Sequence, residues 1–104
     1  MQSARNLRVS DAAAELAERT YRVVRLLPNE ERFALAEQMR RSAVSVGSNV
    51  AEGSGRDGHG ELTHFLRIAL GSATELEFQL TIAVRLGLLT AAQIADSLAC
   101  CRTG

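Results

Sequence analysis

The sequence contains no lysine, and all twelve of its basic residues are arginines. Walker-type phosphate loops and Schiff-base catalysis both depend on a lysine amine, so neither chemistry is expected. Twelve acidic residues balance the arginines, and the chain therefore lacks the positive field that usually marks a nucleic-acid-binding protein. Two explanations of the arginine-only set stay open: a GC-rich genome, or bidentate recognition of carboxylate or phosphate groups.

Proline, cysteine and long apolar runs are also scarce. With one proline, Pro28, and most of the glycines between Gly47 and Gly60, turn signals are too localised for a many-stranded fold. Cys100 and Cys101 are adjacent and poorly placed to bond to each other, which favours a reducing compartment. No segment approaches the roughly 18 apolar residues of a membrane span, and none has the pattern of a signal peptide. We therefore expect a soluble, cytoplasmic protein with no membrane partner.

Helical periodicity and capping residues predict two helices in the first half of the chain. The first should begin at Ser10 or Asp11 and end before Pro28, with residues 1–9 disordered or frayed. The second should begin at Asn29 and run to about Glu52, because an asparagine cap followed by two glutamates suits the positive end of the helix dipole. Its core face is predicted to carry Phe33, Ala36, Met39, Ala43, Val44, Gly47, Val50 and Ala51.

The second half predicts two more helices after a flexible connection, Gly53 to Gly60. The third should run from Glu61 to about Leu86, and Gly87 supplies the left-handed residue that commonly follows a helix. Thr90 and Gln93 form a capping-box pattern that opens a short last helix carrying Ile94 and Leu98. The predicted fold is an all-α, antiparallel up-down four-helix bundle with a short fourth helix, in a single domain over residues 1–104.

The third helix is apolar on two sides. One side suits a bundle core and consists of Leu62, Phe65, Leu66, Ala69, Ala73, Leu76, Leu80, Ala83 and Val84. The opposite side, here called the outer stripe, consists of His64, Ile68, Gly71, Glu75, Phe78 and Ile82. A helix with two apolar sides must be covered on both, so we interpret the outer stripe as an oligomer interface. The alternative is that an extra segment of the same chain covers it.

The second helix carries a compact polar stripe opposite its predicted core face, made of Arg41, Ser45, Ser48, Asn49 and Glu52. Serine and asparagine are mediocre helix formers, and an ordinary exposed surface favours Glu, Arg or Gln instead. Three explanations are open. The stripe is a polar seam within or between subunits, or a surface that binds RNA or another anion through Arg40, Arg41 and Arg56, or a plainly solvated face.

Motifs that suggest catalysis or cofactors lack the context that they need. Gly53, Gly55 and Gly58 match a dinucleotide-binding string, but a helix precedes them instead of a strand. His59 and His64 are five residues apart, which does not place two metal ligands on one helix face. We expect no catalytic residues, no metal and no cofactor. The alternative is a small enzyme that uses the polar stripe around Asn49, Glu52 and Arg56.

Two blocks of sequence resemble the four-helix-bundle family of 23S rRNA intervening-sequence proteins. They are N-x-A-E-G-x-G-R, from Asn49 to Arg56, and A-x-G-S-x-x-E-L-E, from Ala69 to Glu77. The resemblance implies antiparallel bundles that assemble as rings, typically pentamers. The family that the chain resembles is related to accessory proteins of diversity-generating retroelements, which form basic barrels that bind RNA and a reverse transcriptase. This sequence departs from those proteins by its zero net charge and its short last helix. The expected function is therefore that of a non-enzymatic homo-oligomer that acts as a scaffold for RNA or a protein partner.

Overall fold

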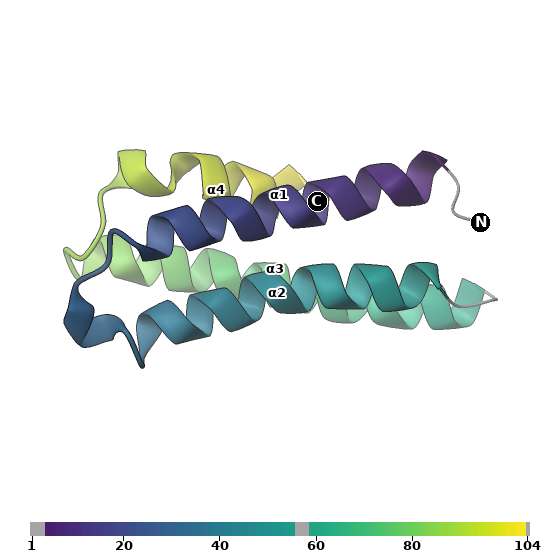
Figure 1. Ribbon diagram of the computed structural model, residues 1–104, viewed down its shortest axis with the longest axis horizontal. Helices are drawn as coiled ribbons and strands as arrows, with labels where there is room; N and C mark the ends of the chain where they lie inside the picture. The colour runs from purple at the N-terminus through teal and green to yellow at the C-terminus, as the bar shows by residue number, and fades with distance from the viewer. Residues whose placement is uncertain (1–3, 56–58, 104) are drawn as a thin grey trace.

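The structure is a computed structural model that describes residues 4–55 and 59–103. Within these ranges the chain forms four α-helices and one short 3₁₀ turn, with no strand: α1 (Ala4–Val24), η1 (Asn29–Glu31), α2 (Leu35–Ser54), α3 (His59–Arg85) and α4 (Ala91–Thr103). The predicted all-α bundle is confirmed. Each helix begins at the end of the bundle where the previous helix finishes (Figure 1).

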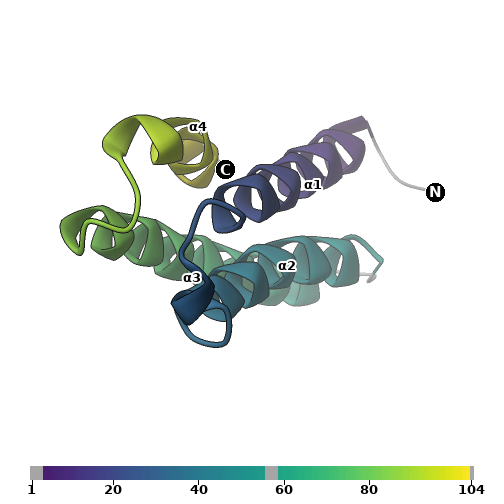
Figure 2. The same ribbon diagram turned by 60° about the vertical axis from the view of Figure 1, so that its left-hand side comes forward.

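The helices contact one another in chain order around the bundle. Helix α2 packs against α1 and α3, and α4 closes the arrangement by packing against both α3 and α1. Figure 2 shows α1 and α4 together on one side of the α2–α3 pair. Within the described residues, no further helix packs against the remaining side of that pair.

Helix α1 begins at Ala4, well before the start predicted at Ser10 or Asp11. Residues 4–9 were predicted to be frayed and are helical in the structure. They include arginine, alanine and leucine, which have high helix propensity, so nothing in the sequence stops the helix at the capping residues. The buried residues Ala13, Leu16 and Val23 fix which side of α1 faces the bundle.

Helix α2 begins six residues later than predicted. Asn29 starts a single 3₁₀ turn, and the α-helix begins only at Leu35. The Arg32 and Ala34 backbone N–H groups donate to the Asn29 and Glu31 carbonyls at 3.1 Å each, which completes the turn before the chain reverses. Phe33 was predicted as the first residue of the core face of this helix. It lies before the helix begins, and its side chain is 79% exposed.

The two connections of α3 follow their local signals closely. Helix α2 extends to Ser54 and α3 begins at His59, so the expected Gly53–Gly60 connection is short. Gly87 has a φ angle of +77°, as predicted for the residue that ends α3. The capping box is confirmed: the Thr90 N–H donates to Gln93 Oε1 at 2.9 Å, and the Gln93 N–H donates to Thr90 Oγ1 at 3.1 Å. This cap places the start of α4.

The buried face of α2 is rotated from the predicted one. Ala36, Met39, Ala43 and Val50 are buried as expected, but Val44 and Ala51 are exposed. Ser42, Val46 and Gly53 are buried in their place. Small residues on this side allow α3 to approach closely, because a Cβ added to Gly53 would lie 3.0 Å from the Cβ of Phe65. Close packing against α3 therefore determines the orientation of α2.

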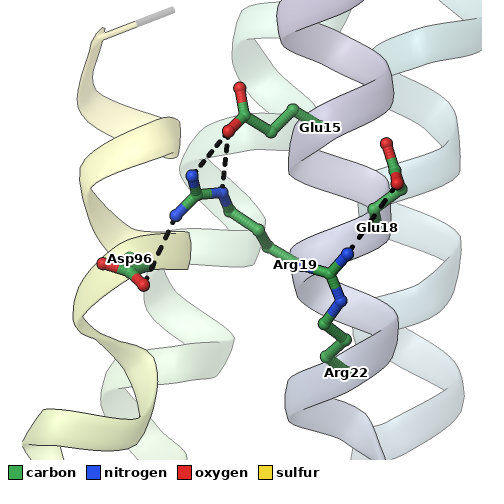
Figure 3. Close-up of polar contacts among 5 residues, drawn as sticks. All are labelled: Glu15, Glu18, Arg19, Arg22 and Asp96. Atoms are coloured by element: carbon green, nitrogen blue, oxygen red, sulfur yellow. Dashed lines mark hydrogen bonds and ion pairs between the residues drawn. The ribbon is translucent and has the colours of Figure 1, made fainter.

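Helix α4 covers only part of the bundle, and ion pairs hold it at both neighbouring helices. Arg19 of α1 donates from Nε to Glu15 at 3.1 Å, and its Nη1 lies 3.4 Å from Asp96 of α4 (Figure 3). Arg102 of α4 contacts Glu77 of α3 at 3.2 Å. Exposed pairs of this kind contribute about 0–1 kcal/mol each, so they orient α4 more than they stabilise it.

Candidate functional site

The two apolar sides of α3 have different environments. Ala69, Ala73, Leu76, Leu80 and Ala83 of the predicted core side are buried, and Leu62, Phe65 and Val84 are half-buried. In the outer stripe, Phe78 is 66% exposed and Ile68 is 40% exposed. His64, Gly71 and Glu75 are also exposed, and Ile82 is half-buried. No segment of the described residues covers this side, so the alternative of a covering segment from the same chain is wrong for them.

The structure brings the polar stripe of α2 next to the outer stripe of α3. The hydroxyl groups of Ser45 and Ser72 form a hydrogen bond of 2.8 Å between the two helices. The Asn49 side-chain amide donates to the Ser45 carbonyl at 2.8 Å and to the Ser45 hydroxyl at 3.2 Å. Part of the polar stripe is thus a seam within the chain, while Arg41, Ser48 and Glu52 remain exposed beside it.

Glycines at the two sides of α3 have opposite surroundings. A Cβ added to Gly71, in the outer stripe, would meet no atom within 4 Å. A Cβ added to Gly53 of α2 would lie 3.0 Å from Phe65 and 3.3 Å from Leu62 Cδ1. Packing inside the chain therefore explains Gly53 but does not explain Gly71, which lowers helix propensity by about 1 kcal/mol relative to alanine.

The three arginines predicted to bind RNA or another anion do not form a common site in the described residues. Arg41 forms an ion pair of 3.0 Å with Glu37 one turn earlier. Arg40 donates from Nη2 to the Arg32 carbonyl at 3.3 Å and lies about 100° away from Arg41 around the helix. Arg56 lies outside the described residues.

Three further apolar side chains are exposed and were not predicted to be so from the sequence: Val9, Leu66 and Leu70. Their exposed fractions are 38%, 39% and 61%. Leu66 was predicted to belong to the core, and this prediction is wrong because its side chain is exposed.

The chemistry of the remaining candidates is limited. The Asn49 amide is engaged with Ser45, so it does not point toward a substrate beside Glu52. Among residues 4–55 and 59–103, no three His, Cys, Asp or Glu side chains are grouped to hold a metal ion. Burial, followed by the charge of Glu77, raises the pKa of the Cys101 thiol to about 11. That thiol is therefore a poor nucleophile near neutral pH.

None of the helices in the described ranges combines the length and apolar character that crossing a membrane requires.

Comparison with known proteins identifies the family. A search of curated proteins found no significant match. A crystal structure of a protein of unknown function from the S23 ribosomal protein family of Bacteroides thetaiotaomicron VPI-5482 matches with a TM-score of 0.83 and 28% sequence identity. The match covers 91% of this chain and 89% of the other. The family described as 23S rRNA-intervening sequence protein matches residues 5–103. The chain therefore belongs to the 23S rRNA-intervening sequence protein family.

Proposed function

We propose that the protein is a non-enzymatic, self-assembling helical bundle, and that copies of the chain associate through the outer stripe of α3. The observation that carries this proposal is the 66% exposure of Phe78 in line with Ile68 and Ile82 on a helix whose other side is already buried. Three large apolar side chains on one helix face, with a glycine between them, suit the packing of another protein surface.

Covering this face would contribute favourably to association, in addition to the other contacts that an interface requires. Burying one phenylalanine or isoleucine side chain completely contributes about 1.5–3 kcal/mol. The exposed parts of Phe78 and Ile68 together amount to about one whole side chain, so burying them would supply about 1.5–3 kcal/mol. That amount corresponds to about tenfold to a hundredfold in a dissociation constant.

The proposal assigns no catalytic role to the polar stripe. Ser45 and Asn49 satisfy each other and Ser72, which supports a positioning role in which the stripe fixes α2 against α3. The proposed location is the cytoplasm, where the free thiols Cys100 and Cys101 stay reduced. Five copies, the number that the family resemblance implies, is part of the same proposal.

Multi-angle light scattering on the purified protein tests the proposal. The parent chain should have a mass several times 11.2 kDa, about five times for a pentamer. Phe78→Glu places a charge in the outer stripe and should reduce the mass toward that of one chain. Phe33→Glu is the matched control, because Phe33 is even more exposed but lies in the α1–α2 connection. A parent that runs as a single chain, or a Phe33→Glu variant that dissociates equally, would contradict the proposal.

A further inference from the structure

Helix α4 separates α1 from α3 along one side of the bundle. It packs against both of these helices, which do not pack against each other in the described part of the chain. Figure 2 shows α4 beside α1, with both helices above the α2–α3 pair. Ile94 and Cys101 of α4 belong to the same buried cluster as Leu16 of α1 and Leu80 of α3. Movement of α4 away from the bundle would therefore open an apolar groove between α1 and α3.

Few side chains hold α4 in this position. Among residues 91–102, three are buried: Ile94, Ser97 and Cys101. Helix α2, by comparison, buries seven residues. Because the stabilisation from burial is roughly proportional to the apolar area removed from water, α4 is held in the bundle less tightly than α2.

The central residue of these three opposes the packing of α4. The Ser97 side chain is 1% exposed, and its Oγ atom has no hydrogen-bond partner among the described residues. Thr20 of α1 is also fully buried, but its hydroxyl donates to the Leu16 carbonyl at 2.8 Å. In water the Ser97 hydroxyl would regain its hydrogen bonds. Opening of α4 would therefore remove a desolvation cost that the packed helix carries.

The charged contacts of α4 are exposed to water. Arg19 Nη1 lies 3.4 Å from Asp96, whose side chain is 86% exposed. Arg102 Nη2 lies 3.2 Å from Glu77 Oε1, and the Arg102 side chain is 60% exposed. Water can replace either partner at little cost, so these pairs contribute little to holding α4 in place. They fix its register against α1 and α3 when it is packed.

The connection before α4 is anchored at the end of the bundle. Leu89 is 4% exposed and belongs to the core cluster, and its N–H donates to the Ala83 carbonyl at 3.3 Å. Helix α4 begins two residues later, at Ala91. A movement of α4 can therefore pivot at Thr90 without displacing α3.

We propose that α4 is a lid that opens while α1, α2 and α3 remain folded. The open form uncovers the groove between α1 and α3, with Arg19 at one edge and Glu77 at the other, and exposes the Cys101 thiol. The lid is independent of the proposed self-assembly, because Glu77 and Phe78 are consecutive residues about 100° apart around α3 and so face different sides. The equilibrium between closed and open α4 then sets access to the groove.

The rate at which iodoacetamide modifies the Cys101 thiol measures this opening. Cys101 is 7% exposed, so the reagent reaches it only after α4 moves. A Cys100→Ser background leaves one thiol in the chain. The modification rate should rise only slightly with low concentrations of urea, because opening of one helix exposes far less surface than global unfolding. A rate that rises as steeply with urea as global unfolding does would overturn the proposal.

Ser97→Ala distinguishes the lid from fraying of the last turn. Removal of the unpaired hydroxyl should favour the closed form and slow the modification of Cys101 about tenfold. Asp96→Ala is the matched control, because it places the same residue on the exposed side of α4 and should change the rate less than about threefold. Fraying of residues 98–103 alone would leave Ser97 buried. An unchanged rate in Ser97→Ala would therefore overturn the proposal, as would an equal slowing by both variants.

Discussion

Alanine substitutions at Gly71 and Gly53 should change stability in opposite directions. Both glycines lie in helices, so alanine removes a helix-propensity penalty of about 1 kcal/mol at an interior position. The Gly71 site has no atom within 4 Å of an added Cβ. The full gain should therefore appear as stability, equivalent to a rise of about 4–8 °C in Tm for a domain of this size.

At Gly53 the same methyl group would lie 3.0 Å from the Cβ of Phe65. Both of these carbons are fixed to their backbones, so the clash between them can be relieved only if α2 and α3 move apart. Overpacking of this kind costs about 1–3 kcal/mol. Gly53 also lies next to the last residue of α2, where the propensity gain is smaller. We expect a net loss of about 1–2 kcal/mol.

Urea denaturation in a Phe78→Glu background measures both effects without a contribution from assembly. The free energies of unfolding of Gly71→Ala and Gly53→Ala are compared with that of the background chain at equal protein concentration. A destabilising Gly71→Ala would mean that the outer side of α3 is covered within a single chain, which would refute the reasoning. Equal stabilisation by both substitutions would refute the close packing of α2 against α3.

Three further predictions concern the core, the α4 cap and the buried thiol. Leu80→Ala should cost about 3–5 kcal/mol in a denaturant titration because Leu80 has no exposed surface, whereas Leu26→Ala, at 52% exposure, should cost under about 1 kcal/mol. Thr90→Ala removes one half of the capping box and should lower the unfolding free energy by about 1 kcal/mol, with the loss of amide protection confined mainly to the start of α4. Burial raises the pKa of the Cys101 thiol from 9.0 to about 11, so unfolding exposes a thiol that ionises more readily. This contribution to stability is present below about pH 9 and is lost as the pH rises to about 11. The urea midpoint of the parent should therefore fall more steeply over this range than that of Cys101→Ala, and identical slopes would contradict the burial of the thiol.

Features encoded within a few consecutive residues could be predicted from the sequence. Gly87 ends α3 with a positive φ angle, and Thr90 with Gln93 opens α4, because each signal is complete without any tertiary contact. The start of α2 could not be predicted in this way. Asn29 and the two glutamates after it form a good cap, yet they make only a 3₁₀ turn, and nothing in residues 32–34 marks the break.

Features that depend on contacts between helices were predicted only in part. The two sides of α3 followed from periodicity, because its apolar residues are regularly spaced. The orientation of α2 did not, because Ser42 and Gly53 are buried only where α3 approaches them closely. Leu66 was expected in the core because it shares the periodicity of the buried residues of α3, yet its side chain is 39% exposed.

Hydroxyl-radical footprinting of the assembled parent would test the assembly face most directly, by comparing two phenylalanines within one molecule. In a single chain Phe33 is 79% exposed and Phe78 is 66% exposed, so both should be oxidised readily when the chain is alone. In the assembled protein we predict that Phe78 is strongly protected while Phe33 is oxidised as before. Equal oxidation of both residues at every protein concentration would contradict association through the outer stripe of α3.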